Sequence, residues 1–162
     1  MPSSRVLNFA GFIACALLIA FAYYLEYVQG LEPCPLCMAQ RLAVIAVGLV
    51  LLVAALHNPA VLGRRIYAGL TLLFAGAGAA LAGRQLWLQS LPPDQVPACG
   101  PGLDYMLEVF PLGEVVLMMI MGTGDCAEVD WTFLGLSIAG WTLVWFALFI
   151  LFAGYQLVRR QK

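Results

Sequence analysis

Four long apolar stretches dominate the sequence and limit what the chain can fold into. Each approaches the roughly 20 apolar residues that a helix needs to cross a lipid core about 30 Å thick. Of the 162 residues, 63% are hydrophobic and 10% are charged, whereas about a quarter of a typical soluble domain is charged. A chain of this size cannot bury so much apolar side chain inside itself. We therefore expect the remainder to face lipid, which excludes a soluble enzyme, a disordered tail and a nucleic-acid-binding protein.

The stretches predict an all-α membrane protein, a bundle of four transmembrane helices forming a single membrane domain over residues 1–162. The spans are expected at about 6–25, 38–57, 66–87 and 133–158. The second span reaches a workable length if Met38–Arg41 lie at the interface, with the Arg41 side chain extended toward the headgroups. The first span is longer than the apolar core of a signal peptide, and no convincing cleavage site follows it. We expect it to be retained.

The charged residues predict the orientation of the bundle. All nine acidic residues lie in 26–41 or 84–130, while six of the eight basic residues lie near the termini or in 57–65. These six are Arg5, Arg64, Arg65, Arg159, Arg160 and Lys162. Lys and Arg mark the cytoplasmic side of membrane proteins. Both termini are therefore expected inside, and the loops at about 26–37 and 88–132 are expected in the periplasm of a bacterial inner membrane.

A further apolar run, Val115–Met121, is too short to cross the membrane. A fifth crossing would also contradict the charge pattern. We expect a short helix that lies in the outer interface with its apolar face toward lipid.

Small residues recur every four positions in the third span, at Ala75, Ala79 and Gly83. Such spacing lets neighbouring helices approach closely. It predicts a helix-packing face rather than a ligand site.

Four of the five cysteines fall in the two outer loops: Cys34 and Cys37 in the first, Cys99 and Cys126 in the second. The fifth, Cys15, lies in the middle of a span, where a cysteine behaves as a small buried hydrophobe. The periplasm is oxidising, so cysteine pairs there can form disulfides. Four cysteines can also bind zinc, but structural zinc sites use two closely spaced pairs, and Cys99 and Cys126 do not form one. We expect no metal.

The pair Cys34-Pro35-Leu36-Cys37 directly precedes the second span. Proline fits the first turn of a helix, so Cys37 is expected near the partial positive charge of the helix N-terminus. Arg41 follows four residues later on the same face. Both effects favour a reactive thiolate. A disulfide across so few residues stabilises little, so this pair is better explained as redox-active than as a structural link.

The second pair, Cys99 and Cys126, is separated by 26 residues, and the loop is rich in Pro and Gly at its start. That composition resists regular structure, so a disulfide here would be accessible to a soluble partner. Taken alone, this pair fits a structural disulfide equally well.

These residues resemble the DsbB family of bacterial inner-membrane thiol oxidases, which pass electrons from a soluble disulfide carrier to quinone. The resemblance rests on Cys34-Pro35-Leu36-Cys37 with Arg41, on Cys99, and on a run from Gly124-Asp125-Cys126-Ala127-Glu128 to Trp131 and Phe133-Leu134-Gly135-Leu136. It implies a DsbA-like periplasmic thiol oxidase as partner, ubiquinone or menaquinone as cofactor, and the lipid bilayer as surroundings. Nothing in the sequence requires more than a monomer.

The resemblance also implies roles for single residues. The partner's thiolate would attack Cys99, and the released Cys126 would exchange with Cys34, so that Cys37 becomes the thiolate facing the quinone. Arg41 would stabilise that thiolate and the charge developing on the quinone. Some family members carry a histidine near the quinone, where this chain has Gln85 or its neighbours.

Two other interpretations remain at this point. One is a membrane scaffold or small-molecule channel with two structural disulfides. The other is a related thiol oxidoreductase that works in the reducing direction. The redox states of the two pairs, with and without quinone, would separate all three.

Overall fold

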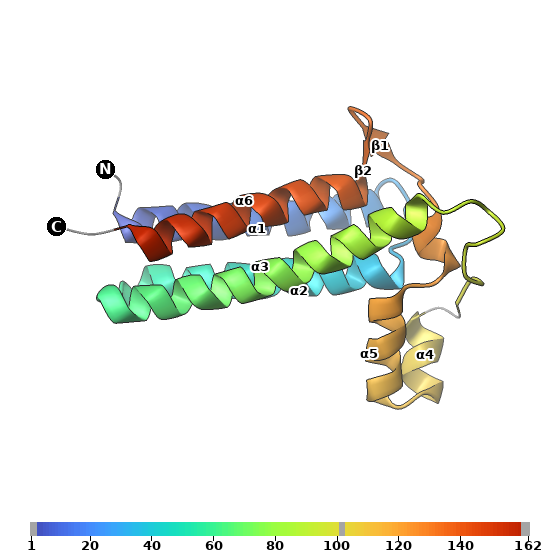
Figure 1. The fold of residues 1–162 in the computed structure, drawn as a ribbon, viewed down its shortest axis with the longest axis horizontal. Helices are drawn as coiled ribbons and strands as arrows, with labels where there is room; N and C mark the ends of the chain where they lie inside the picture. The colour runs from blue at the N-terminus through green and yellow to red at the C-terminus, as the bar shows by residue number, and fades with distance from the viewer. Residues whose placement is uncertain (1–2, 101–102, 160–162) are drawn as a thin grey trace.

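Four long helices run side by side through the molecule (Figure 1). The computed structural model describes residues 3–100 and 103–159. The helices are α1 (Ser4–Tyr27), α2 (Pro35–His57), α3 (Val61–Gln89) and α6 (Ile138–Val158), and each is long and apolar enough to cross a membrane. The predicted four-helix membrane bundle is confirmed, with each end of α1, α2 and α3 within five residues of its expected position.

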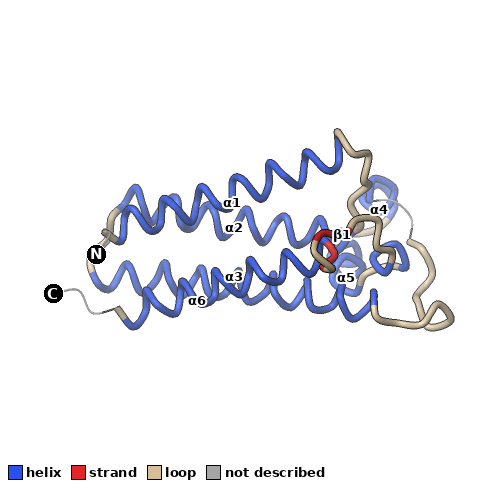
Figure 2. The backbone as a smooth tube through the Cα atoms, turned by 90° about the horizontal axis from the view of Figure 1, so that it is seen from above, coloured by secondary structure: helices blue, strands red, loops and turns tan. Residues whose placement is uncertain are grey.

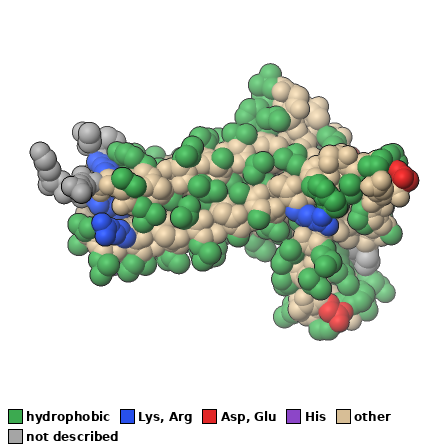
Figure 3. Space-filling model, viewed as in Figure 1, with side chains coloured by type: hydrophobic (Ala, Val, Ile, Leu, Met, Phe, Trp, Pro, Cys, Tyr) green, Lys and Arg blue, Asp and Glu red, His purple; other side chains and the backbone are tan. Residues whose placement is uncertain are grey.

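Both ends of the described chain lie at one end of the bundle, beside the short turn between α2 and α3 (Figure 1). Basic side chains gather at this end, and acidic side chains appear at the opposite end (Figure 3). Arg64 and Arg65 lie in the first turns of α3 rather than in a loop, and Arg64 donates to the main-chain oxygen of Arg159 at 2.9 Å. Arg160 and Lys162, also predicted on this side, lie outside the described residues. The arrangement agrees with two cytoplasmic termini.

The bundle core is made where α1 packs on α2, α2 on α3 and α3 on α6. On α3 the buried stripe runs through Ala68, Thr71, Ala75, Gly78, Ala82, Gln85 and Leu88. A Cβ added to Gly78 would lie 2.2 Å from Cζ of Phe146, whereas one added to Gly83 would meet nothing within 4 Å. Small residues do allow close packing, but the closest approach is at Gly78 and not at Gly83.

One buried polar contact joins the first and last helices near the cytoplasmic end. Nε2 of Gln156 on α6 donates to Oδ1 of Asn8 on α1 at 2.6 Å, and both side chains are buried. A carboxamide in a membrane interior is costly unless it is paired. This hydrogen bond gives each of the two carboxamides a partner inside the bundle.

Two short helices project sideways from the periplasmic end of the bundle (Figure 1), and Figure 2 shows them at the same end. They are α4 (Leu103–Val109) and α5 (Leu112–Met121), and α5 contains the predicted apolar run. Nε of Arg84 donates to the main-chain oxygen of Met121 at 3.2 Å, which ties the end of α5 to α3. The expected short interfacial helix is confirmed, and α4 is an addition that the sequence did not reveal.

The last helix begins at Ile138, five residues later than the expected span. The preceding residues form a small hairpin of β1 (Thr132–Phe133) and β2 (Leu136–Ser137), paired Thr132 to Ser137 and Phe133 to Leu136. Its turn residues, Leu134 and Gly135, have φ of 52° and 81°. Positive φ at both positions is what a tight two-residue hairpin turn requires. Apolar composition alone could not distinguish this hairpin from a helical turn.

Candidate redox site

The first cysteine pair lies where α2 begins. Cys34 is the N-cap residue, its Sγ accepts from the main-chain N–H of Cys37 at 3.3 Å, and Pro35 occupies the first helical turn. The predicted position of Pro35 is confirmed. Capping by a sulfur leaves both thiols of the pair at the positive end of the helix.

Three of the four outer-loop cysteines meet at this point. Sγ of Cys34 lies 2.9 Å from Sγ of Cys37, and Cys126 packs against Cys34 and Leu36 in a small buried cluster. Cys126 comes from the 3₁₀ turn η1 (Gly124–Ala127), and its side chain is 0% exposed. Cys34 therefore contacts a sulfur from its own loop and a sulfur from the other loop. All five cysteines are free thiols in the structure.

Cys99 stands apart from this group and is exposed. The main-chain N–H of Gly124 donates to the carbonyl of Ala98 at 3.1 Å, which holds the neighbouring segment against η1. A Cβ on Gly124 would lie 2.4 Å from the carbonyl oxygen of Pro97, so only glycine allows this approach. The two cysteines of the second loop are thus on adjacent backbone, one open to solvent and one buried. Cys15 is buried in the hydrophobic core, as expected.

The surroundings of these thiols shift their pKa values in different directions. Contact with the Cys34 thiol lowers the pKa of Cys126 to about 6, despite burial. The pKa of Cys34 is raised, because its proton is shared with Cys126 and Cys37. A hydrogen bond to the Asp125 carboxylate raises the pKa of the Cys99 thiol. The thiol of Cys126 therefore ionises more readily than the thiols of Cys34 and Cys99.

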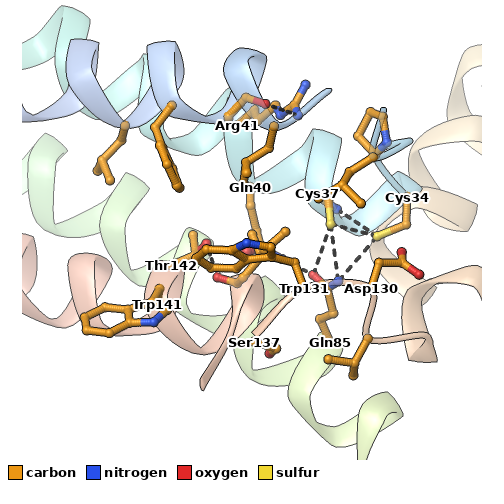
Figure 4. Close-up of a pocket in the computed structure, with 18 of the residues that line it drawn as sticks. Cys34, Cys37, Gln40, Arg41, Gln85, Asp130, Trp131, Ser137, Trp141 and Thr142 are labelled. Carbon is orange, nitrogen blue, oxygen red and sulfur yellow. Dashed lines mark hydrogen bonds between the residues drawn. The ribbon is translucent and has the colours of Figure 1, made fainter. Parts of the chain in front are cut away.

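Two carboxamides lie near the first pair, Gln85 beside the sulfurs and Gln40 next to Gln85 (Figure 4). Nε2 of Gln85, on α3, donates to Sγ of Cys37 at 3.3 Å and to Sγ of Cys34 at 3.4 Å. Nε2 of Gln40, on α2, donates to Oε1 of Gln85 at 2.6 Å. The sequence marked Gln85 only as a departure from a family pattern, and it did not mark Gln40. The signal in the sequence that could have identified both residues is an uncharged polar side chain inside each of two apolar spans.

Arg41 lies at the same level but turns toward α1. Its guanidinium forms a salt bridge with Glu26, donates to the main-chain oxygen of Ala22 at 3.2 Å and lies over the ring of Tyr23. In the sequence, Glu26 is distinguished only as one of the acidic residues on the outer side. Its carboxylate and the carbonyl oxygen of Ala22 hold the positive charge of Arg41 on the α1 side of the site.

A cavity of about 310 Å³ opens in front of Cys37 (Figure 4). Its volume is at the lower end of the range for small-molecule sites, which are mostly apolar with a few polar groups. Side chains of all four long helices and of the segment before α6 line it. The polar or reactive ones include Cys34, Cys37, Gln40, Arg41 and Gln85, and the aromatic ones are Phe21, Trp131, Phe133, Trp141 and Trp145. The cavity therefore suits a flat, apolar ring with polar substituents placed beside a thiol.

Comparison with known proteins identifies the family. Residues 4–156 match the family model described as disulfide bond formation protein DsbB. The chain is 61% identical over 160 residues to disulfide bond formation protein B of Hahella chejuensis, covering 99% of this chain and 97% of the relative. It is 59% identical over 149 residues to the protein of that name from Marinobacter nauticus, covering 92% of this chain and 89% of the relative. It is 52% identical over 160 residues to the protein of that name from Stutzerimonas stutzeri, covering 99% of this chain and 98% of the relative. This chain belongs to the DsbB family of membrane disulfide bond formation proteins.

Proposed function

We propose that this protein oxidises the dithiol of a DsbA-like periplasmic thiol oxidase and passes the electrons through its two cysteine pairs to membrane quinone. It is a multi-pass protein of the bacterial inner membrane and a protein-dithiol:quinone oxidoreductase. The observation that carries the proposed route is the contact of Cys34 with both Cys37 and Cys126, while Cys99 is exposed. Cys34 can exchange disulfides with either neighbour.

The first exchange takes place at the water-facing pair. A thiolate of the soluble partner attacks Sγ of Cys99 in a Cys99–Cys126 disulfide, which forms a mixed disulfide and releases Cys126 as the thiolate. Exposure of Cys99 and burial of Cys126 support this direction of attack. The partner's second thiol then displaces Cys99, which gains a proton, and the partner leaves oxidised.

The second exchange moves the disulfide to the membrane side. The Cys126 thiolate attacks Sγ of Cys34 in a Cys34–Cys37 disulfide; a Cys126–Cys34 bond forms and the electron pair of the broken bond remains on Cys37. Contact between Cys126 and Cys34 supports this step. The thiolate so formed stands at the cavity.

A ubiquinone or menaquinone bound in the cavity would supply the acceptor for two electrons and two protons, leaving the cysteines as disulfides. The fit rests on the aromatic lining and on the position of Cys37 at the cavity wall. We assign Arg41 to this site because its side chain lines the same cavity, where a guanidinium that is paired with Glu26 can still offer an N–H donor to a bound oxygen. Every residue invoked comes from one chain, so we propose that the protein acts as a monomer.

Single cysteine substitutions test the route. In membranes supplied with reduced partner and quinone, Cys34→Ser and Cys37→Ser should each abolish oxidation of the partner, while Cys15→Ser should retain it. Full turnover by either of the first two variants would overturn the relay. A scaffold with structural disulfides instead predicts that both pairs resist mild reductant and that quinone does not change their redox state.

A further inference from the structure

The buried carboxamide of Gln85 contacts the reactive sulfurs, and the buried carboxamide of Gln40 contacts that of Gln85. Both side chains are 4% exposed, in helices that cross the membrane. Gln85 donates to the two sulfurs of the first pair at 3.3 and 3.4 Å, and Figure 4 shows these contacts converging on Cys34 and Cys37. The comparable buried carboxamides of Asn8 on α1 and Gln156 on α6 are hydrogen-bonded to each other. Satisfying a buried amide therefore does not by itself require a cysteine.

The contact between the two glutamines orients the donor. Nε2 of Gln40 donates to Oε1 of Gln85 at 2.6 Å, which fixes the amide plane of Gln85 with its Nε2 against both sulfurs. The same oxygen accepts from Sγ of Cys37 at 3.6 Å, a contact that exists only while Cys37 is a thiol, whereas the N–H contacts remain available to the thiolate. An N–H donor stabilises a thiolate more than a thiol, because the hydrogen bond to the charged form is stronger. In the dry surroundings of the helix bundle this preference is larger than in water.

We propose that Gln85 is a catalytic residue that stabilises the thiolate left on Cys37 when the Cys34–Cys37 disulfide opens, and that Gln40 is its positioning residue. The inference deepens the proposed function and rests on it. When Cys126 attacks Cys34, the electron pair of the broken bond stays on Cys37, and the N–H of Gln85 is already in place to donate a hydrogen bond to that sulfur. An amide has no titratable proton near neutral pH, so it donates equally well on both sides of neutrality.

Stabilising the reduced form makes a cysteine pair a stronger oxidant. Gln85 therefore assists transfer of electrons from the water-facing pair to the membrane-facing pair. Removing its N–H should make the Cys34–Cys37 pair harder to reduce, whatever happens at the quinone.

The test is a redox equilibrium of the full chain in phospholipid vesicles without quinone. Cys99→Ser and Cys126→Ser are included throughout, so that Cys34 and Cys37 form the pair under study. Two glutathione molecules give two electrons and two protons to the disulfide, which yields the dithiol and one glutathione disulfide. The fraction of dithiol is read by alkylation and mass shift across a series of glutathione ratios.

Gln85→Met keeps the side-chain length and removes the donor. We expect half-reduction to need a roughly tenfold higher ratio of squared glutathione to glutathione disulfide, equal to about 30 mV for a two-electron couple. Gln40→Met should shift the ratio in the same direction by less. Gln156→Met is the matched control, because it removes an equally buried carboxamide far from the cysteines, and its ratio should not move.

An unchanged ratio in Gln85→Met, or an equal shift in Gln156→Met, would overturn the proposal. If Gln85→Met fails to fold, as judged by thermal unfolding, Gln40→Met decides, and no shift there overturns it equally. The equilibrium uses neither partner nor quinone. Its failure would thus leave the proposed function standing, which Cys37→Ser turnover tests separately.

Discussion

Gly78→Ala should destabilise the bundle by pushing α3 away from α6. The added Cβ would lie 2.2, 2.3 and 2.7 Å from Cζ, Cε1 and Cε2 of Phe146, where carbon atoms normally rest at about 3.5–4.0 Å. The ring of Phe146 is 0% exposed and packs in the core, so it has no open space to enter. Helix or ring must move by more than about 1 Å. Overpacking of this kind costs about 1–3 kcal/mol.

The same helix offers a matched control. A Cβ on Gly76, two residues away on another face of the helix, would meet nothing within 4 Å. Gly76→Ala should therefore leave the free energy of unfolding unchanged, or raise it by up to about 1 kcal/mol because alanine favours a helix over glycine. The difference between the two variants removes this shared propensity effect.

Unfolding in mixed micelles by titration with a denaturing detergent, followed by helical circular dichroism, measures both variants. Phe146→Leu shortens the opposing side chain, so Gly78→Ala should cost clearly less in that background than in the wild type. Partner oxidation should fall as well, because Gln85 lies two turns along the same buried stripe of α3. Equal stability of Gly78→Ala and Gly76→Ala, or an equal cost of Gly78→Ala in both backgrounds, would refute the reasoning.

Three further outcomes follow from the periplasmic segment. Asp125→Asn removes the carboxylate that raises the pKa of Cys99, so alkylation of reduced Cys99 between pH 7 and 8 should become faster; an unchanged rate would contradict the assigned contact. Cys126 has a folded pKa of about 6 against an ordinary value of 9.0, so its contribution to the stability of the reduced protein is complete above pH 9 and is lost as the pH falls toward 6. As the pH falls from 9 to 6, the melting temperature of the wild type should therefore decline by more than that of Cys126→Ser. Parallel plots of melting temperature against pH for the two proteins would exclude a lowered pKa of Cys126. Leu134→Asn should stabilise the hairpin by about 1 kcal/mol, because asparagine tolerates a φ of 52° and the leucine side chain is 79% exposed; a lower free energy of unfolding would show that the leucine makes a contact of its own.

Much of the architecture could be predicted from residue type along the chain. The four spans follow from apolar length, and the shared end of the termini follows from the basic residues beside them. The start of α2 was predictable because Pro35 has a strong positional preference in helices. These features depend on local sequence and on the difference between lipid and water.

The contacts that shape the site depend on tertiary structure. Gln40 and Gln85 are 45 residues apart, and the pairing of Arg41 with Glu26 joins different helices. Nothing in the local pattern says which apolar span lies beside which. The same limit applies to α3, where Gly78 and Gly83 are both small, and only the position of Phe146 makes one of them indispensable.

The hydrogen bond between Asn8 and Gln156 has a consequence for biogenesis. The two residues are 148 positions apart, so α1 enters the membrane long before its partner on α6 is synthesised. During that interval the amide of Asn8 lacks this hydrogen bond. An unpaired amide in lipid costs free energy, so α1 is less stable in the membrane than its apolar residues suggest. Insertion of α6 completes the contact and locks the first helix to the last. Chains released before Ile138 should accordingly be degraded faster than the full chain, and Asn8→Leu should narrow that difference in a pulse-chase measurement.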